Sequence, residues 1–162
     1  MNLLTLARSA PASVLLLVLA LLPASCASLE PKPAWIERAI SAGSDPLLMD
    51  CTALAIQKSG FPVGSGIDPG RLVAVSGWHI SLAPFRGKGY REQCEVRHER
   101  LSQGKYKVSI RVRRDKNDDL LHPLDVSYAV WVPEPDNVDR ARMVMQHIQS
   151  LLGTGVEISS SR

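Results

Sequence analysis

The amino-acid sequence predicts an α+β domain of two layers, in which an antiparallel sheet of three to four strands has helices packed on one face. Two kinds of pattern support this prediction. Segments near residues 50 and 145 have apolar residues at the three- and four-residue spacing of an amphipathic helix. Between them, residues 90–101 and 105–114 alternate apolar and polar side chains, as strands with one buried face do.

The first helix is predicted to begin at Asp45 and Pro46, because a carboxylate can cap backbone N–H groups and proline fits a first helical turn. Gly60 provides a C-terminal cap. The expected core face consists of Leu47, Leu48, Cys51, Leu54 and Ala55. We expect a shorter helical turn before this helix, at residues 34–41, and a loop after it, at residues 61–70, which contains two prolines and three glycines.

The two alternating segments are predicted to form a β-hairpin. Matching their apolar faces requires the numbers of paired residues to add up to an even number. A sum of 206 places Glu99 opposite Lys107, whereas a sum of 204 would place Arg97 opposite Lys107, a pair of like charges. The register with sum 206 leaves a three-residue turn, 102–104, which ends in a glycine where a left-handed backbone is needed.

A further strand is expected upstream, at residues 71–82. Its apolar residues change from odd to even positions across Ser76–Gly77, which indicates a β-bulge. The residues concerned are Val73, Val75, Trp78, Ile80 and Leu82. Residues 126–132 are expected to form a short fourth strand.

The last element is predicted to be a helix. Asp136 or Asn137 is its cap, and Gly153 ends it. Its apolar side consists of Val138, Ala141, Val144, Met145, Ile148, Leu151 and Leu152. Two helices and a sheet with one apolar face make the predicted two layers.

The first 25 residues have the layout of a secretory signal. Arg8 precedes a purely apolar run, Val14–Leu22, and Pro23 and small residues follow. This run is too short to cross a bilayer, which needs about 20 residues. Cys26, directly after the small residues, resembles the cysteine in the lipobox of bacterial lipoproteins. The match departs from the family pattern at Pro23, where the family prefers leucine or a similar residue.

The resemblance implies that Cys26 is acylated and becomes the first residue of a lipid-anchored cell-envelope protein. Ala27 follows it, and the aspartate that retains many such lipoproteins at the inner membrane is missing. The resemblance therefore points to the outer membrane, with the domain facing the periplasm. A cut by ordinary signal peptidase after Ala27 is the alternative, and it would release a soluble secreted domain.

The predicted organisation of the chain has four parts. A signal peptide occupies residues 1–25, and the lipid-attachment cysteine with a proline-containing spacer occupies residues 26–34. A single α+β domain follows at residues 35–153. The remaining residues, 154–162, are small and polar and are expected to form a disordered tail.

Cys51 and Cys94 remain in the mature chain under either cut. An exported compartment permits a disulfide between them. It would close a loop of 94 − 51 = 43 residues, which the chain-entropy model values at ~4 kcal/mol. Two buried free thiols that act as small apolar groups are the alternative. The sequence leaves both open.

Charge is unevenly distributed, although the formal net charge of the 162 residues is only +3. Residues 86–116 contain 11 basic and 4 acidic residues, whereas residues 117–139 contain 6 acidic residues and no Lys or Arg. The two stretches are expected either to neutralise each other, to be solvated, or to form a site for an anionic partner on the polar face of the hairpin. The basic residues of this face are Arg97, Lys105, Lys107, Arg111, Arg113 and Arg114.

The sequence contains no recognisable catalytic set. The four histidines have no metal-ligand spacing with another His, Cys or carboxylate, so that neither a metal site nor a cofactor is predicted. His79 is expected to be exposed, and His98 to lie at the edge of the core. His122 falls in the acidic stretch and His147 on the polar face of the last helix.

These observations predict a non-catalytic binding or assembly module of the cell envelope. The expected partners are the membrane, through the N-terminal lipid, and an envelope protein or anionic envelope polymer. Nucleic acid is not expected, because the basic segments lack interleaved aromatic residues. An exported hydrolase with an unrecognised site is the alternative, and it would require a pocket in which a histidine meets a serine or a carboxylate.

Overall fold

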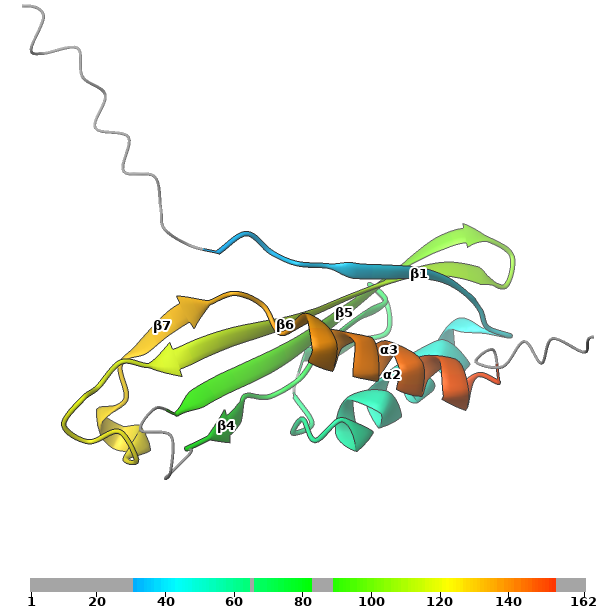
Figure 1. The fold of residues 1–162 in the computed structure, drawn as a ribbon. Coiled ribbons are helices and arrows are strands. Elements are labelled where there is room, and N and C mark those ends of the chain that lie inside the picture. Colours follow the sequence, from blue (N-terminus) through cyan, green and yellow to red (C-terminus); the bar gives the residue numbers. More distant parts are fainter. Residues whose placement is uncertain (1–30, 65, 83–88, 154–162) are drawn as a thin grey trace, which may run out of the picture.

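The structure is a computed structural model that describes residues 31–64, 66–82 and 89–153. The leader with Cys26 and the tail at residues 154–162 lie outside these residues, and the predictions for them stay predictions. The described chain folds into a seven-stranded antiparallel sheet and two α-helices (Figure 1). The α+β class is confirmed, but the expected three to four strands are too few.

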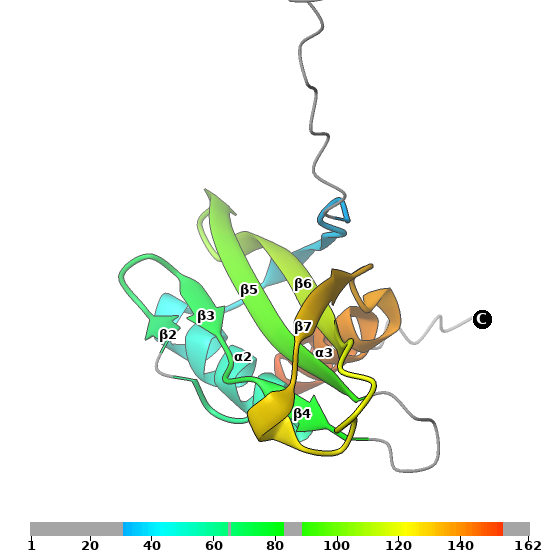
Figure 2. The same ribbon diagram turned by 90° about the vertical axis from the view of Figure 1, so that its left-hand side faces the viewer.

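The strands are β1 (Ile36–Ser41), β2 (Gly66–Asp68), β3 (Val73–Val75), β4 (His79–Ser81), β5 (Tyr90–Ser102), β6 (Lys105–Asn117) and β7 (Trp131–Glu134). The helices are α2 (Asp45–Lys58) and α3 (Val138–Leu151), and a 3-10 turn, Val126–Tyr128, lies before β7. The β5–β6 hairpin is the centre of the sheet, and both helices lie on one side of it (Figure 2).

The hairpin has the predicted register. Every pair from Tyr90–Lys116 to Arg100–Tyr106 adds up to 206, and the pairing becomes irregular only between Arg100 and Ser102. Gly104 adopts the left-handed backbone conformation, with φ of 69°. The turn therefore forms as expected, because glycine has no Cβ that would oppose this conformation.

Each outer edge of the hairpin is shared by two shorter strands. Along β6, β1 covers Lys105–Ile110 and β7 covers Arg114–Asn117. Along β5, β3 covers Glu95–Arg97 and β4 covers Tyr90–Glu92. Between the paired stretches each edge lacks a strand partner for two or three residues.

The additional strands correct three predictions. Residues 34–41 do not form a helical turn, because Ile36–Ser41 pairs with the free edge of β6 and buries Ile40 in the core. The loop predicted at residues 61–70 contains β2, which pairs with β3. The strand expected at residues 126–132 begins only at Trp131, after the 3-10 turn. Edge strands of this kind gain their backbone hydrogen bonds from a neighbouring strand, which local sequence does not show.

The predicted bulge at Ser76–Gly77 is confirmed by a change of register. Residue numbers add up to 170 where Val75 pairs with Glu95, and to 171 where His79 pairs with Glu92. One extra residue therefore lies between β3 and β4 opposite β5, as in a bulge. The apolar residues at positions 73, 75, 78 and 80 lie on the face away from the helices.

The same arrangement corrects the expectation for His79. Its ring is half-buried on the helix side and makes an edge contact with Phe61, with 6.3 Å between the ring centroids. On the helix side of β3, Ala74 is fully buried opposite Val96.

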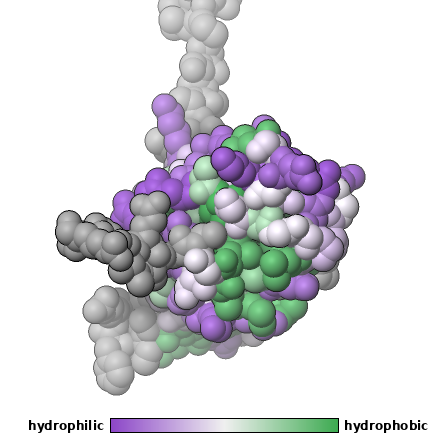
Figure 3. All heavy atoms as spheres, turned by 90° about the vertical axis from the view of Figure 1, so that its right-hand side faces the viewer, coloured by the Kyte–Doolittle hydropathy of each residue, from purple (hydrophilic) through white to green (hydrophobic). Residues whose placement is uncertain are grey.

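Helix α2 begins and ends close to the predicted positions, but its core face is rotated. Ser44 is the N-cap, with its Oγ 3.4 Å from the N–H of Leu47, and Gly60 follows the helix with φ of 78°. The buried residues are Leu48, Met49, Cys51, Thr52, Ala55 and Ile56. Leu47 and Leu54, which were expected in the core, are each 47% exposed. Figure 3 shows that apolar side chains also gather on the outer surface of the molecule.

Helix α3 agrees with its prediction. Asn137 is the N-cap, and its Oδ1 accepts a hydrogen bond from the N–H of Arg140. The residues buried against the sheet are Ala141, Val144, Met145 and Ile148. Gly153, with φ of 69°, follows the helix. Across the described ranges, neither helix has the length and apolar character that crossing a membrane requires.

Candidate functional site

The end of the β5–β6 hairpin far from its turn carries two neighbouring pairs of opposite charge. Arg91 lies opposite Asp115, and Glu92 lies opposite Arg114. Since side chains alternate along a strand, the two pairs lie on opposite faces of the sheet. Both carboxylates are only 1% exposed. Their surroundings decide what each pair can do.

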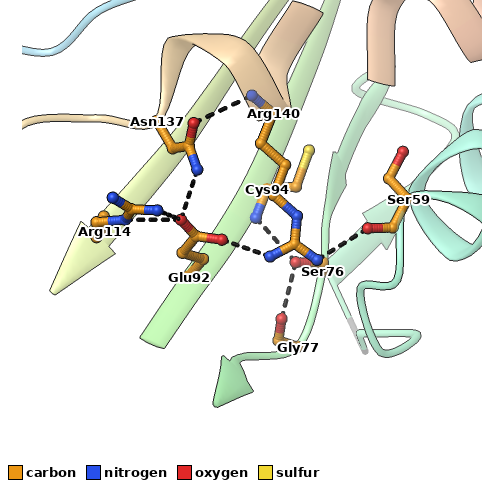
Figure 4. A network of polar contacts seen from close by, with 8 residues as sticks. All are labelled: Ser59, Ser76, Gly77, Glu92, Cys94, Arg114, Asn137 and Arg140. Carbon is orange, nitrogen blue, oxygen red and sulfur yellow. Dashed lines mark hydrogen bonds and ion pairs between the residues drawn. The ribbon is translucent and has the colours of Figure 1, made fainter. Parts of the chain in front are cut away.

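We call Glu92, Arg114, Asn137 and Arg140 the helix-side cluster (Figure 4). Arg114 Nε and Asn137 Nδ2 donate to Glu92 Oε1 at 2.7 Å and 2.8 Å, and the guanidinium of Arg140 binds Oε2. Arg140 also donates to the backbone oxygen of Ser59 at 2.8 Å. The cluster therefore ties both strands of the hairpin to α3 and to the end of α2.

The environment of Glu92 favours its charged form. Burial alone would raise the pKa of Glu92, but hydrogen bonds from Asn137, Arg140 and Arg114 outweigh this effect and hold its pKa below the usual value. The guanidinium carbon of Arg140 lies 4.1 Å from the centroid of the buried Phe61 ring. Its partner Arg140 is only 14% exposed, whereas Arg114 is 32% exposed. Because the cluster joins the hairpin to both helices, its role in the fold is structural.

One of the two described cysteines, Cys94, lies on β5 opposite the bulge at Ser76–Gly77. Ser76 exchanges hydrogen bonds with Cys94: its N–H donates to the oxygen of Cys94, and its Oγ accepts from the N–H of Cys94, both at 2.9 Å (Figure 4). Burial raises the pKa of Cys94 to about 12 and also raises that of Cys51. Both cysteines are buried free thiols, without a disulfide between them.

We call Arg91, Arg113, Asp115, Trp78 and Trp131 the open-side cluster. Arg91 binds Asp115 Oδ2 through Nε and a terminal nitrogen, each at 2.8 Å, and Arg113 Nε donates to Oδ1 at 3.2 Å. The guanidinium carbon of Arg91 lies 4.2 Å from the ring centroid of Trp78 and 5.0 Å from that of Trp131. Two arginines thus share one carboxylate, which leaves this cluster with one excess positive charge.

The tryptophans correct the expectation that the basic face lacks aromatic residues. Both tryptophans come from outside the two hairpin strands. A third, Trp35, also contacts a basic residue of this face, because its ring centroid lies 4.5 Å from the guanidinium carbon of Arg97. The register of the hairpin could have indicated Asp115, since the sum of 206 places it opposite Arg91. No local pattern could have placed Trp78 or Trp131, because strand pairing across the sheet brings them there.

The six predicted basic residues have different surroundings. Three are matched one to one with a carboxylate: Arg97 with Glu95 (2.6 Å), Lys107 with Glu37 (2.9 Å) and Arg111 with Asp136 (2.7 Å). Arg114 belongs to the helix-side cluster, and Lys105 is exposed beside the hairpin turn. Arg113 is 46% exposed and only shares Asp115 with Arg91. Neutralisation within the fold therefore accounts for much of the basic stretch, and Arg113 remains the best-placed cation.

A pocket lies beside Arg113, at the break between β1 and β7 along the edge of β6. We call it the gap pocket, and it is lined by Pro31, Arg111, Arg113, Arg114, Pro133 and Glu134. The N–H of Asn137 donates to the oxygen of Val112 at 2.8 Å within the break. The N–H of Ala34 donates to Asp136 at 2.7 Å. The last residues of the predicted spacer therefore lie against the domain.

The described histidines do not build a catalytic site at this pocket. His98 is 7% exposed, as expected for the core edge, and its Nε2 lies 3.0 Å from Thr52 Oγ1. His147 Nδ1 lies 3.1 Å from Ser59 Oγ, but Ser59 is buried and its hydroxyl donates to the oxygen of Ala55. Neither pair lines the gap pocket. Within the described ranges no group of three His, Cys, Asp or Glu side chains could hold a metal ion.

Comparisons with known proteins add nothing to this geometry. No protein-family model matches the chain, and no curated protein matches its sequence.

Proposed function

We propose that this chain is a lipid-anchored cell-envelope protein that binds an anionic envelope component, without catalysis, at the gap pocket. The observation that carries the binding part of the proposal is that three arginines, Arg111, Arg113 and Arg114, line the gap pocket with a single carboxylate, Glu134, and that Arg113 is the most exposed of the three. Asp115 is shared by Arg91 and Arg113, and Arg113 is 46% exposed at the rim of the pocket.

The chemistry of the pocket favours a ligand with phosphate, sulfate or carboxylate groups. Arginine presents a planar set of donors that matches these groups, and stacking on tryptophan fixes the guanidinium plane of Arg91 beside Arg113. Because Asp115 and Asp136 already hold Arg113 and Arg111 in position, a ligand would meet side chains that are ordered in advance.

The anchoring part of the proposal rests on the leader. Arg8, the apolar run Val14–Leu22 and the small residues before Cys26 are typical of an exported lipoprotein precursor. If Cys26 is acylated, only a short segment separates the lipid from Pro31, which lines the gap pocket. The ligand would then be met close to the membrane surface.

Binding is tested by titrating the acylated protein, in detergent micelles, with short-chain polyphosphate as a minimal anionic polymer. We expect Arg113→Gln to weaken binding about tenfold, which corresponds to about 1.4 kcal/mol. Arg97→Gln is the matched control, because Glu95 already neutralises Arg97, and we expect a change of less than about twofold. Equal losses in both variants, or no binding by the wild type, would contradict the proposed site.

The anchor is tested separately by the mass of the mature N-terminus. We expect a diacylated or triacylated cysteine in the wild type and no fatty-acid incorporation in Cys26→Ala. A mature chain that begins after Ala27 with no lipid would support a secreted domain instead and would overturn the anchoring part of the proposal.

A further inference from the structure

The connection between β6 and β7 exposes an unusual amount of apolar surface. Leu120 and Leu121, which are 78% and 84% exposed, are the two most exposed large apolar side chains in the described part of the chain. Other apolar side chains of the connection that are at least 44% exposed are Leu124, Val126, Tyr128 and Val130. Clustered exposure of this kind indicates a contact surface, since single exposed apolar residues are ordinary but groups are not.

The backbone of this connection is held in a defined conformation. Asn117 Oδ1 accepts hydrogen bonds from the N–H groups of Asp119 and Val130, both at 3.0 Å, and so joins the two ends. Asp119 Oδ1 accepts from the N–H of Leu121 at 2.8 Å. The rings of His122 and Tyr128 stack with centroids 4.4 Å apart. The exposed leucines are therefore presented by an ordered loop, which reduces the entropy lost when they are buried.

Charge limits what this loop can contact. Residues 118–130 contain three aspartates and no Lys or Arg, so a strongly anionic surface would repel the loop. The carboxylates of Asp119 and Asp125 accept hydrogen bonds from backbone N–H groups of the loop. A surface without net charge that can take up leucine, valine and tyrosine fits best, and the interfacial region of a zwitterionic phospholipid bilayer has this character.

The position of the loop relative to the start of the domain supports the same occupant. Pro31 lines the gap pocket together with Pro133 of β7, and the loop joins the other end of this strand, at Trp131 (Figure 1). Four residues of β-strand span about 13 Å. The chain from Cys26 to Pro31 can span at most about 18 Å. A membrane that holds a lipid on Cys26 is therefore within reach of the loop.

We propose that the apolar tip of residues 118–130 inserts into the interfacial region of the phospholipid bilayer that holds the N-terminal lipid, an inference that rests on the proposed acylation of Cys26. The domain then has two points of contact with the membrane. The spacer alone would leave its orientation free, and the loop fixes which end of the hairpin faces the bilayer.

The test uses the full acylated protein in phosphatidylcholine vesicles, with an environment-sensitive dye on Leu121→Cys. Gln103→Cys, at the exposed turn at the opposite end of the hairpin, is the matched control. Cys51 and Cys94 are buried, and their pKa values are raised by burial, so labelling of the folded protein is directed to the new thiol. We expect spin-labelled acyl chains to quench the dye at position 121 at least threefold more than the dye at position 103.

A second variant checks that the leucine side chains cause the contact. With the dye on Leu124→Cys, the exposed double substitution L120Q/L121Q should lower the quenching at least twofold while far-UV circular dichroism stays unchanged. Equal quenching at positions 121 and 103, or none at 121, overturns the proposal, and so does a loop that docks only on another protein, since pure lipid vesicles would then give no quenching.

The mass of the N-terminus in the same preparation separates this inference from the proposed anchor. An acylated N-terminus without quenching at position 121 overturns the loop contact and leaves the anchor standing. An N-terminus without lipid overturns both.

Discussion

The helix-side and open-side clusters contain the same chemistry in two different settings. Each has one carboxylate that is 1% exposed and is shared by two arginines, and they originate from neighbouring cross-strand pairs of one hairpin. Helix α3 covers the first, and the partly buried rings of Trp78 and Trp131 border the second. The difference shows that an ion pair becomes structural or available to a ligand according to what packs over it.

The arginine side chains make this difference measurable. In the helix-side cluster, Arg140 is 14% exposed and is held by Glu92, the oxygen of Ser59 and the ring of Phe61. In the open-side cluster, Arg113 is 46% exposed and can be hydrated on its outer edge. Removing a carboxylate should therefore cost much more free energy on the helix side than on the open side.

The largest expected effect is that of Glu92→Gln. This substitution leaves the buried guanidinium of Arg140 without a counter-charge, and we expect the free energy of unfolding to fall by about 3–5 kcal/mol. Urea unfolding of the mature protein, followed by circular dichroism, measures it. Asp115→Asn is the matched substitution on the open side, and we expect a loss of about 1–3 kcal/mol because both arginines reach solvent. Equal losses would show that the cover provided by α3 does not matter.

Acid should reduce the difference in unfolding free energy between the wild type and Glu92→Gln. Because the pKa of Glu92 is lower in the folded state than the ordinary value of 4.5, its contribution to stability is complete above this value and is lost as the pH falls through the folded pKa. One proton accounts for at most about 1.4 kcal/mol per pH unit. We therefore expect the unfolding free energy of the wild type to fall more steeply below pH 4.5 than that of Glu92→Gln.

His98 gives a control for the acid profile in a higher pH range. Burial lowers its pKa below 6.5, although a hydrogen bond with the oxygen of Leu72 acts in the opposite direction. Its contribution to stability is therefore complete above pH 6.5 and declines as the pH falls below it. His98 is present in both proteins, so its titration should leave their difference in unfolding free energy unchanged. If this difference already changes between pH 6.5 and 5, the change would not come from Glu92 and would contradict the assignment.

The smallest expected effects are those of the arginine–aromatic contacts. Double-mutant cycles should give a coupling free energy of about 2 kcal/mol for Arg140 with Phe61, and about 0.5–1 kcal/mol for Arg91 with Trp78, because a cation–π contact is stronger where water is excluded. Phe61 is 3% exposed, whereas Trp78 is only partly buried. A larger coupling free energy for Arg91 with Trp78 than for Arg140 with Phe61 would contradict this prediction.

The sequence predicted the central hairpin well and its neighbours poorly. The two thirteen-residue strands have apolar residues that alternate over their central parts, opposite charges that favour one register, and a glycine in the turn. These features carry enough local information to determine β5 and β6. The outer strands have three to six residues each, and their conformation depends on the edge that they meet. Residues 34–41, expected as a helical turn, became β1 for this reason.

Local patterns also could not show which face an apolar residue would occupy. The change of parity at Ser76–Gly77 was read correctly as a bulge, yet the apolar side chains around it lie on the face away from the helices. Trp78 could therefore join Arg91 and Arg113 in the open-side cluster. Leu47 and Leu54 were assigned to the core of α2 and are exposed, because the helix packs with a neighbouring stripe of side chains against the sheet.

By itself, the sequence determined the class of the fold, the register of its central hairpin and the limits of α3, since these depend on interactions between residues close in the chain or on strict periodicity. Only the tertiary structure decided that Arg113 retains an excess charge beside a pocket, while Glu92 is enclosed by α3. Both outcomes depend on which distant segments pack over each face of the sheet, and burial controls whether a charge must be neutralised within the protein or can meet a partner.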